Sequence, residues 1–225
     1  MKSERLRAIV LRRTNYGEAD RIIQLLSPEG RRAVMARGVR KEKSRLAGGI
    51  ELFAVCDVVI GKGRGALQIL TSARLVTFYR HIMEDYDRME FGYEAMRHVA
   101  AASETVDEPE WYDILSEVLM ALDTKSIDIA LTKTWFYLQH SRMLGRELSL
   151  SHDIHGAKLT KDTRYVYDVA ESGFREAPNG PITSSHLTLL RLTLTKPLSV
   201  LVQVGGIDSV VHECLLVAQQ HAAVA

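Results

Sequence analysis

The hydrophobic pattern of this chain changes its period near residue 78, and this change constrains the fold more than any other feature. Before it, short runs rich in β-branched residues are separated by turn residues, a pattern typical of strands. These runs cover residues 5–13, 21–26, 32–39, 52–60 and 66–76. After it, apolar residues recur at three- and four-residue spacing, which is typical of amphipathic helices. Five short strands in about 75 residues predict a small barrel, of which the oligonucleotide-binding (OB) fold is one type.

The predicted fold class is therefore α+β, with two domains. Residues 1–78 are expected to form the β-barrel, and residues 79–225 an α-helical domain. Helices are predicted over residues 78–102, 110–122, 127–144, 184–195 and 198–221, with interruptions at Lys196-Pro197 and at Gly205-Gly206. Residues 146–181 are irregular, with a possible short strand at 165–169.

Charge is divided unevenly between the two parts. Residues 1–80 contain 17 Lys plus Arg against 7 Asp plus Glu, whereas residues 81–225 contain 12 against 21, although the whole chain has a net charge of only +1. Such an asymmetry indicates that the first part faces a polyanion, such as nucleic acid or an acidic membrane surface. The alternative is a basic face that only interacts with solvent.

The densest basic cluster lies at residues 31–45. Neither face of its predicted strand is uniformly apolar, as in an edge strand, and the following loop could place its cations on successive phosphates. Only two residues before position 76 are aromatic, Tyr16 and Phe53, so we expect affinity to come from phosphates rather than from base stacking. The predicted nucleic-acid-binding residues are Arg31, Arg32, Arg37, Arg40, Lys41, Lys43 and Arg45, with Lys62 and Arg64 on a glycine-rich loop.

No motif supports catalysis. The glycines at 61, 63 and 65 precede a strand rather than a helix, so they do not form a dinucleotide loop, and the chain has no Walker sequence. Glu18 and Asp20 lie between two strands, where we expect them to shape the turn. We therefore predict that the protein is not an enzyme and has no catalytic residues.

The cysteines and histidines do not form a recognisable metal site. Cys56 and Cys214 are too few for a cysteine zinc site, and Cys214 is expected in the core. His152 and His155 have the spacing of half a zinc finger, but no second pair follows at a suitable distance. No apolar run approaches the roughly 18 residues of a membrane helix, and we expect a cytoplasmic protein that makes no contact with membranes.

Several short motifs resemble the DNA repair protein RecO family. They are Tyr16-Gly17-Glu18-Ala19-Asp20, Ser27-Pro28-Glu29-Gly30, Ala36-Arg37-Gly38-Val39-Arg40 and Gly63-Arg64-Gly65. Their order and spacing match over the N-terminal 80 residues, and the rest of the chain is similar to the family's helical domain at a lower level. Many members carry a four-cysteine zinc finger in that domain. This sequence has only His152 and His155 near the position of the first pair, so residues 146–181 resemble a degenerate zinc finger and we predict no cofactor.

The resemblance implies that residues 1–78 form an OB-fold DNA-binding domain, joined to a helical domain at residues 79–225, in a recombination mediator. Such a protein binds single- and double-stranded DNA, anneals complementary strands, and assists RecA loading on DNA coated with single-stranded DNA-binding protein (SSB), together with RecR. The acidic SSB tail would need basic residues in the helical domain, and we assign it to Lys133, Arg142 and Arg146. The alternative is a general OB-fold nucleic-acid-binding module without mediator activity.

Overall fold

The computed structural model describes residues 3–63 and 67–223, which form two compact units, Met1–Asp123 and Thr124–Ala225. The first unit contains β1 (Glu4–Tyr16), β2 (Asp20–Ser27), β3 (Gly30–Ala36), β4 (Ala54–Gly61), β5 (Gln68–Phe78), α1 (Tyr86–Ala102) and α2 (Glu110–Asp123), with short 3-10 helices at Ala47–Gly49 and Arg80–Glu84. The second unit contains α3 (Ile129–Met143), β6 (Tyr165–Asp168), β7 (Gly173–Glu176), α4 (Ser184–Thr195), α5 (Leu198–Leu201), a 3-10 helix at Ile207–Ser209, and α6 (Val211–Ala223).

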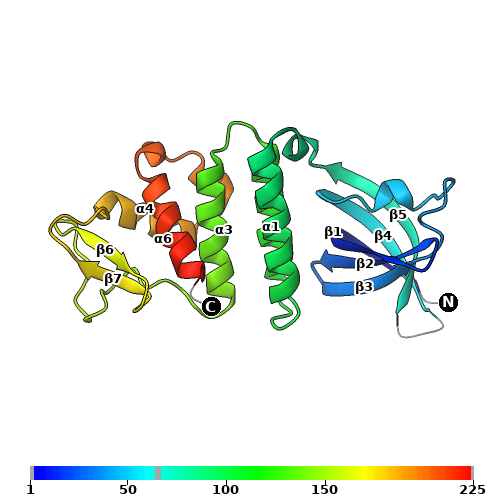
Figure 1. The fold of residues 1–225 in the computed structure, drawn as a ribbon, viewed down its shortest axis with the longest axis horizontal. Helices are drawn as coiled ribbons and strands as arrows, with labels where there is room; N and C mark the ends of the chain where they lie inside the picture. Colours follow the sequence, from blue (N-terminus) through cyan, green and yellow to red (C-terminus); the bar gives the residue numbers. More distant parts are fainter. Residues whose placement is uncertain (1–2, 64–66, 224–225) are drawn as a thin grey trace. The chain divides into compact units, whose positions relative to one another are not determined.

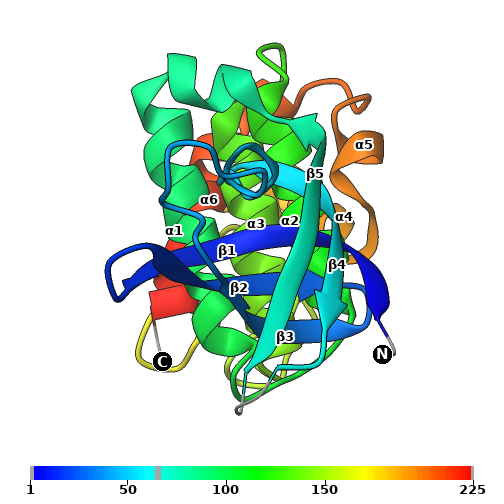
Figure 2. The same cartoon turned by 90° about the vertical axis from the view of Figure 1, so that its right-hand side faces the viewer.

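The five strands of the first unit close into a barrel in the order β1-β2-β3-β5-β4 (Figure 2). Four of the pairings are antiparallel, and only the β3–β5 pairing is parallel. Alternate residues of the strands point inward and form an apolar core. Its fully buried members include Ala8, Val10, Ile23, Leu25, Val34, Ala36, Cys56 and Val58. The predicted α+β class with an N-terminal barrel is confirmed.

One expectation about the barrel is wrong. The mixed polarity of β3 indicated an edge strand, but β3 pairs with β2 on one side and with β5 on the other, where Val34 lies opposite Gln68 and Met35 opposite Ile69. Barrel closure gives β3 a partner strand on both sides and leaves no open edge there.

Helices α1 and α2 belong to the same compact unit as the barrel. The change from strand to helix lies where the sequence pattern changes, with β5 ending at Phe78, although a 3-10 turn delays the start of α1 to Tyr86. The two compact units separate after Asp123, so this division groups α1 and α2 with the barrel. The predicted functional division between residues 78 and 79 stays a prediction.

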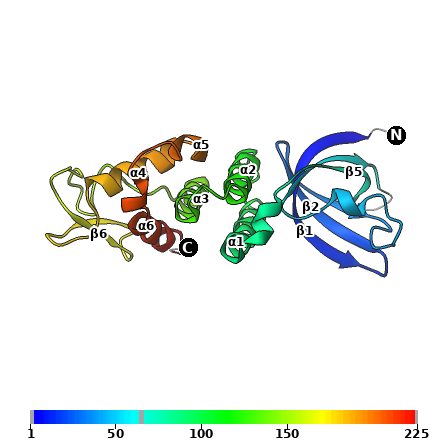
Figure 3. The ribbon, with the colours of Figure 1, turned by 90° about the horizontal axis from the view of Figure 1, so that it is seen from above.

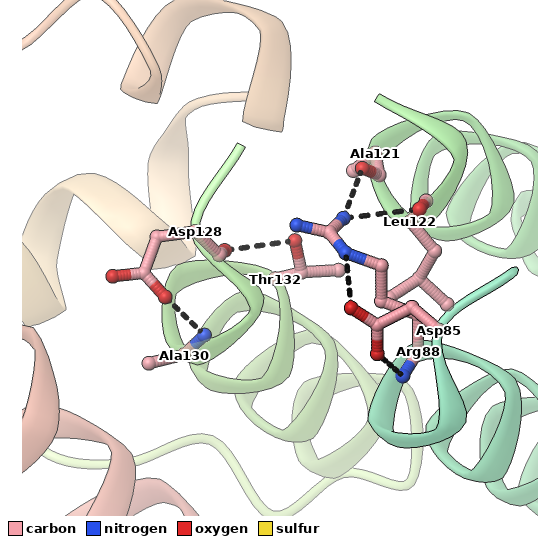
Figure 4. A network of polar contacts seen from close by, with 7 residues as sticks. All are labelled: Asp85, Arg88, Ala121, Leu122, Asp128, Ala130 and Thr132. Atoms are coloured by element: carbon pink, nitrogen blue, oxygen red, sulfur yellow. Dashed lines mark hydrogen bonds and ion pairs between the residues drawn. The ribbon is translucent and has the colours of Figure 1, made fainter. Parts of the chain in front are cut away.

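A buried arginine ties α1 to the end of α2 (Figure 4). The Arg88 guanidinium Nη1 donates to the carbonyl oxygens of Leu122 at 3.0 Å and Ala121 at 3.4 Å. Asp85 caps the N-terminus of α1 by accepting a hydrogen bond from the Arg88 backbone N–H at 3.1 Å. These contacts satisfy backbone groups that a helix end leaves without partners.

The second unit combines a helical bundle with a small hairpin (Figures 1 and 3). Helix α3 contacts α4 and α6, and its N-cap Asp128 accepts a hydrogen bond from Ala130 N–H at 2.7 Å. The predicted strand at 165–169 corresponds to β6, but its partner β7 was missed. The helical stretch predicted at 198–221, with its interruption at Gly205-Gly206, corresponds to α5 and α6, and Gly206 between them lies in the left-handed region at φ +79°. No described helix is both long enough and apolar enough to cross a membrane.

Candidate nucleic-acid interface

The segment from Arg37 to Arg45, hereafter the basic loop, follows β3 and carries most of the predicted DNA-binding residues. Arg37, Lys41, Lys43 and Arg45 are all exposed. Their side chains form no hydrogen bond or ion pair with any residue that the structure describes. Four cations with unused donors on one short loop are suited to an anionic partner that supplies several acceptors, such as a phosphate backbone.

The basic loop is held against the β1–β2 turn by hydrogen bonds. The Asp20 carboxylate accepts one from the Gly38 backbone N–H at 2.7 Å, and the Arg40 N–H donates to Ala19 O at 2.9 Å. The Arg40 guanidinium also donates to Gly17 O at 3.2 Å. Gly17 and Gly38 both have left-handed backbone, at φ +57° and +62°, which favours glycine.

This bracing gives the sequence motifs a structural role. Tyr16-Gly17-Glu18-Ala19-Asp20 forms the β1–β2 turn, and Ala36-Arg37-Gly38-Val39-Arg40 begins the basic loop. Asp20 shapes the structure by accepting a backbone N–H, as the sequence suggested, although the donor lies 18 residues away. Arg40 contributes partly to the support of the loop, so it is a poorer candidate for DNA contact than its four neighbours.

The two arginines at the start of β3 are engaged elsewhere. Arg31 forms an ion pair with Glu104 at 2.7 Å, and its side chain is only 19% exposed. Its backbone N–H donates to the carboxylate of Asp107 at 3.3 Å. The Arg32 guanidinium donates to the Arg31 carbonyl at 2.9 Å and is half-buried. We therefore do not place Arg31 on the DNA-binding surface, and Arg32 has less freedom to reach a phosphate than the loop cations have.

Other barrel cations are neutralised in the same way. Asp57 on β4 pairs with Arg7 of β1 and with Arg74 of β5, each at 3.1 Å. The hydrogen bonds from Arg7 and Arg74 hold the pKa of the Asp57 carboxyl below its ordinary value. The high charge of the first 80 residues therefore overstates how many cations are available to a partner.

The glycine-rich loop is only partly described. Lys62 is exposed at the end of β4 and forms no ion pair with a described residue. Arg64 lies outside the residues that the structure describes. The assignment of both to DNA binding stays a prediction.

A cleft of about 960 Å³ lies between α1 and the strands β1 and β2, and the sequence analysis missed it. Arg12, Arg13 and Arg21 from the strands and Arg97 from the helix line it. The signal in the sequence is only the adjacent pair Arg12-Arg13, directly after the apolar run at residues 8–11. Nothing in the spacing of residues indicates that Arg97 comes close to them.

The residues assigned to the SSB tail lie on or just after α3. Lys133, Arg142 and Arg146 are all half-buried rather than fully exposed. The Arg142 Nε donates to the side-chain oxygen of Gln139 at 2.9 Å, and the carbonyl of Arg146 lies 2.8 Å from His221 Nε2. Each of the three already has interactions within the chain, so their role in partner binding stays a prediction.

The histidines and cysteines remain without a metal-binding geometry in the described residues. His152 and His155 are exposed, and His152 contacts the hydroxyl of Ser151 at 3.0 Å. No group of three or more His, Cys, Asp or Glu among residues 3–63 and 67–223 is arranged to hold a metal ion. Cys214 is fully buried, which confirms its expected place in the core, and Cys56 is buried in the barrel.

Comparison with known proteins finds a matching protein family and several similar DNA repair proteins. Residues 1–79 match the family described as "Recombination protein O N terminal". The chain is 37% identical over 129 residues to the DNA repair protein RecO of Roseiflexus sp. (strain RS-1), which covers 56% of this chain and 45% of that protein. It is 35% identical over 134 residues to RecO of Synechococcus elongatus, covering 57% and 50%. With RecO of Syntrophomonas wolfei it shares 27% identity over 171 residues, covering 75% and 67%. These alignments to the first two proteins span about half of their length.

Proposed function

We propose that this chain, which belongs to the RecO family of DNA repair proteins, binds the sugar-phosphate backbone of single- and double-stranded DNA through its basic loop. The observation that carries the proposal is the set of four exposed, unpaired cations at Arg37, Lys41, Lys43 and Arg45 on a loop braced by Asp20. Phosphate contacts of this kind contribute affinity without reading sequence, which is what a protein acting on any damaged DNA requires.

The activity that we propose is a mediator role in DNA repair and recombination. Annealing of complementary strands needs screening of two polyanions and no bond breaking, and a basic surface can supply this without ATP. We further propose that the protein acts on SSB-coated DNA with RecR, that it thereby assists RecA loading, and that the acidic SSB tail contacts Lys133, Arg142 or Arg146. We assign no catalytic residue and no cofactor, and we expect the protein to work in the cytoplasm, where bacterial DNA lies.

The first experiment tests DNA binding. A variant with Arg37→Ala, Lys41→Ala and Lys43→Ala should bind DNA more weakly whatever its sequence. Its dependence of log K on log salt concentration should be shallower by up to about 3, because each lost phosphate contact removes about 0.9 from the slope on duplex DNA. The matched control replaces Lys158, Lys161 and Lys196, three exposed lysines of the second unit, by Ala. An equal change in both variants would show that only net charge matters.

The second experiment separates a mediator from a general DNA-binding module. Two complementary oligonucleotides, one carrying a fluorophore, are mixed with the protein in chelator and without ATP, with and without SSB. Annealing of SSB-coated strands supports the mediator role. Binding without annealing would favour the simpler OB-fold module, and absence of binding even at low salt would contradict the proposed surface.

A further inference from the structure

The cleft between α1 and the strands β1 and β2 differs in chemistry from the basic loop. All its lining residues lie between positions 11 and 104, so it belongs entirely to the first compact unit. The strands contribute Leu11, Arg12, Thr14, Asn15, Arg21 and Gln24. The helix contributes Tyr93, Met96, Arg97, Ala100 and Ala101. The cleft therefore combines an apolar wall with cationic and amide groups, whereas the side chains exposed on the basic loop are mainly cations.

Phe53 supports the helix that forms one wall. It has left-handed backbone at φ +55°, which is uncommon for a residue other than glycine, and it is almost fully buried. A Cβ atom at Gly92 would lie 2.8 Å from the Phe53 ring, so the helix approaches this ring closely because position 92 is glycine. The ring of Tyr93 is tilted against that of Phe53, with centroids 4.7 Å apart. Phe53 therefore fixes the position of Tyr93 at the cleft.

The cleft keeps a positive charge after its internal pairs are counted. Arg13 is paired with Glu51 at 2.8 Å, and Glu104 is paired with Arg31 at 2.7 Å. Among the described residues, the Arg21 side chain donates only to the neutral amide oxygen of Asn15, at 3.1 Å. Arg12 and Arg97 are exposed and form no ion pair or hydrogen bond with any described residue. Three arginines thus face the cleft without a carboxylate partner, and the ligand should be an anion.

We propose that this cleft holds a short stretch of single-stranded DNA, with phosphates on Arg12, Arg21 and Arg97 and a base against the ring of Tyr93. The inference rests on the proposed DNA-binding function and adds a preference for strand type. Tyr93 is 45% exposed, so one part of its ring packs on Phe53 while another remains available for stacking. Base stacking on an aromatic ring beside a cationic groove is the usual way in which single strands are bound without sequence preference.

Duplex DNA does not fit this chemistry. In a duplex the base faces are stacked on one another, so only base edges and phosphates are accessible to a protein. The exposed ring of Tyr93 and the partly buried side chain of Leu52 gain little from such a surface, whereas an unstacked base buries its face against them. The basic loop binds phosphates of either strand type, and the cleft should add affinity only for single strands.

The first test compares two single-stranded ligands of equal length, oligo(dT) and an oligonucleotide in which every site is abasic. The unmodified protein should bind oligo(dT) about 5-fold or more tightly than the abasic strand, the smallest gain expected from stacking of one base. Tyr93→Leu should abolish this difference, whereas Tyr93→Phe should keep it because the ring remains. Equal affinity of the unmodified protein for both strands would overturn the proposal.

The second test replaces Arg12 and Arg97 by Ala and measures binding to single-stranded and duplex DNA. Single-strand binding should weaken and its salt slope should become shallower by about 1.4, at about 0.7 for each phosphate contact, while duplex binding stays unchanged. The matched control is Arg37→Ala with Lys41→Ala, which should weaken both. Because both variants change exposed residues, their unfolding temperatures should match that of the unmodified protein.

The outcomes distinguish this inference from the proposed function. If the unmodified protein binds neither form of DNA, the proposed function fails. If it binds both forms and the Arg12 and Arg97 substitutions affect neither, or affect both equally, only the single-strand cleft fails. If the same substitutions leave DNA binding intact but abolish binding of a glutamate-rich peptide, the cleft binds an acidic peptide and the proposal is overturned.

Discussion

The arginines of the second unit all interact within the chain, whereas several arginines of the first unit have no described partner. In the first unit, Arg12, Arg37 and Arg97 are exposed and form no hydrogen bond or ion pair with a described residue. In the second unit, the guanidinium of Arg191 donates to Leu150 O at 2.8 and 3.1 Å, and that of Arg164 donates to Gly180 O at 2.7 Å. Local charge alone therefore does not locate a binding surface. The unused hydrogen-bond donors of each cation decide whether it can receive an external anion.

The largest effect on stability is expected at Arg88 of the first unit. Unlike Arg12, Arg37 and Arg97, this arginine is buried and hydrogen-bonded. Arg88→Met removes the donors to the carbonyls of Ala121 and Leu122 and should lower the free energy of unfolding by about 3 kcal/mol, since one hydrogen bond to a charged group contributes about 1.5–3 kcal/mol. Urea denaturation measures this. Arg97→Met, an exposed change on the same helix, should cost about 0.5 kcal/mol or less. Similar losses for both variants would show that burial does not distinguish the two arginines.

Asp20 tests whether the shape of the basic loop matters beyond its charge. Asp20→Ala removes the acceptor for Gly38 N–H, and the expected cost is about 1–3 kcal/mol of stability. It also makes the protein more positive, so electrostatics alone predicts tighter DNA binding. We expect weaker binding, because the loop cations lose their fixed spacing. Fluorescence anisotropy with a labelled duplex measures the affinity.

Glu18→Ala is the matched control for Asp20→Ala. It makes the same change in charge on the same turn, but Glu18 is exposed and pairs with no described residue. Its DNA affinity should be unchanged or slightly higher. If Asp20→Ala also bound DNA more tightly, the basic loop would act through its charge alone and the bracing would have no functional role.

The sequence predicted the fold better than the site. The change of period near Phe78 depends on local spacing, and so the barrel strands and the helices over Glu110–Asp123 and Ser184–Thr195 were found nearly at their true bounds. The pairing of Arg31 with Glu104 depends on a contact between residues 73 positions apart. The cleft likewise depends on how α1 docks on β1, through Phe53 in an uncommon conformation. Local patterns carry no information on such contacts, so they do not show that Arg31 is paired or that Arg12 and Arg97 line one cleft.

A buried histidine of the second unit should make stability depend on pH. In the neutral form of His221, Nε2–H donates to Arg146 O and Nδ1 accepts from the Tyr167 hydroxyl, each at 2.8 Å. Burial lowers the pKa of His221, although the hydrogen bond to Arg146 acts in the opposite direction. The folded state thus holds this proton less tightly than the unfolded state does. Stability from this group is complete above about pH 6.5 and declines as the pH falls below that value.

Thermal unfolding at pH 7.5 and 5.5 measures this dependence. The unmodified protein should lose stability at the lower pH, and His221→Gln should lose less between the two, although it is less stable at pH 7.5. Some dependence should remain, because burial also lowers the pKa of His98 and His186. His155→Gln, at an exposed position, serves as the control and should behave as the unmodified protein. Identical pH dependence in the His221 variant would exclude this histidine as a cause.

The smallest effect is expected where the two units do not differ. Cys56 lies in the barrel core and Cys214 among buried residues of α6, and burial raises the pKa of the first thiol to about 11 and of the second to about 12. Since the thiolate is the reactive form, neither should react with a thiol reagent at pH 8 until the chain unfolds. Reagent added in guanidinium should label both thiols. Treatment of the folded protein with the same reagent should label neither and should leave DNA affinity unchanged. Rapid reaction of only one thiol in the folded state would show that the unit containing it opens locally. The two units would then differ in the stability of their cores as well as in the pairing of their arginines.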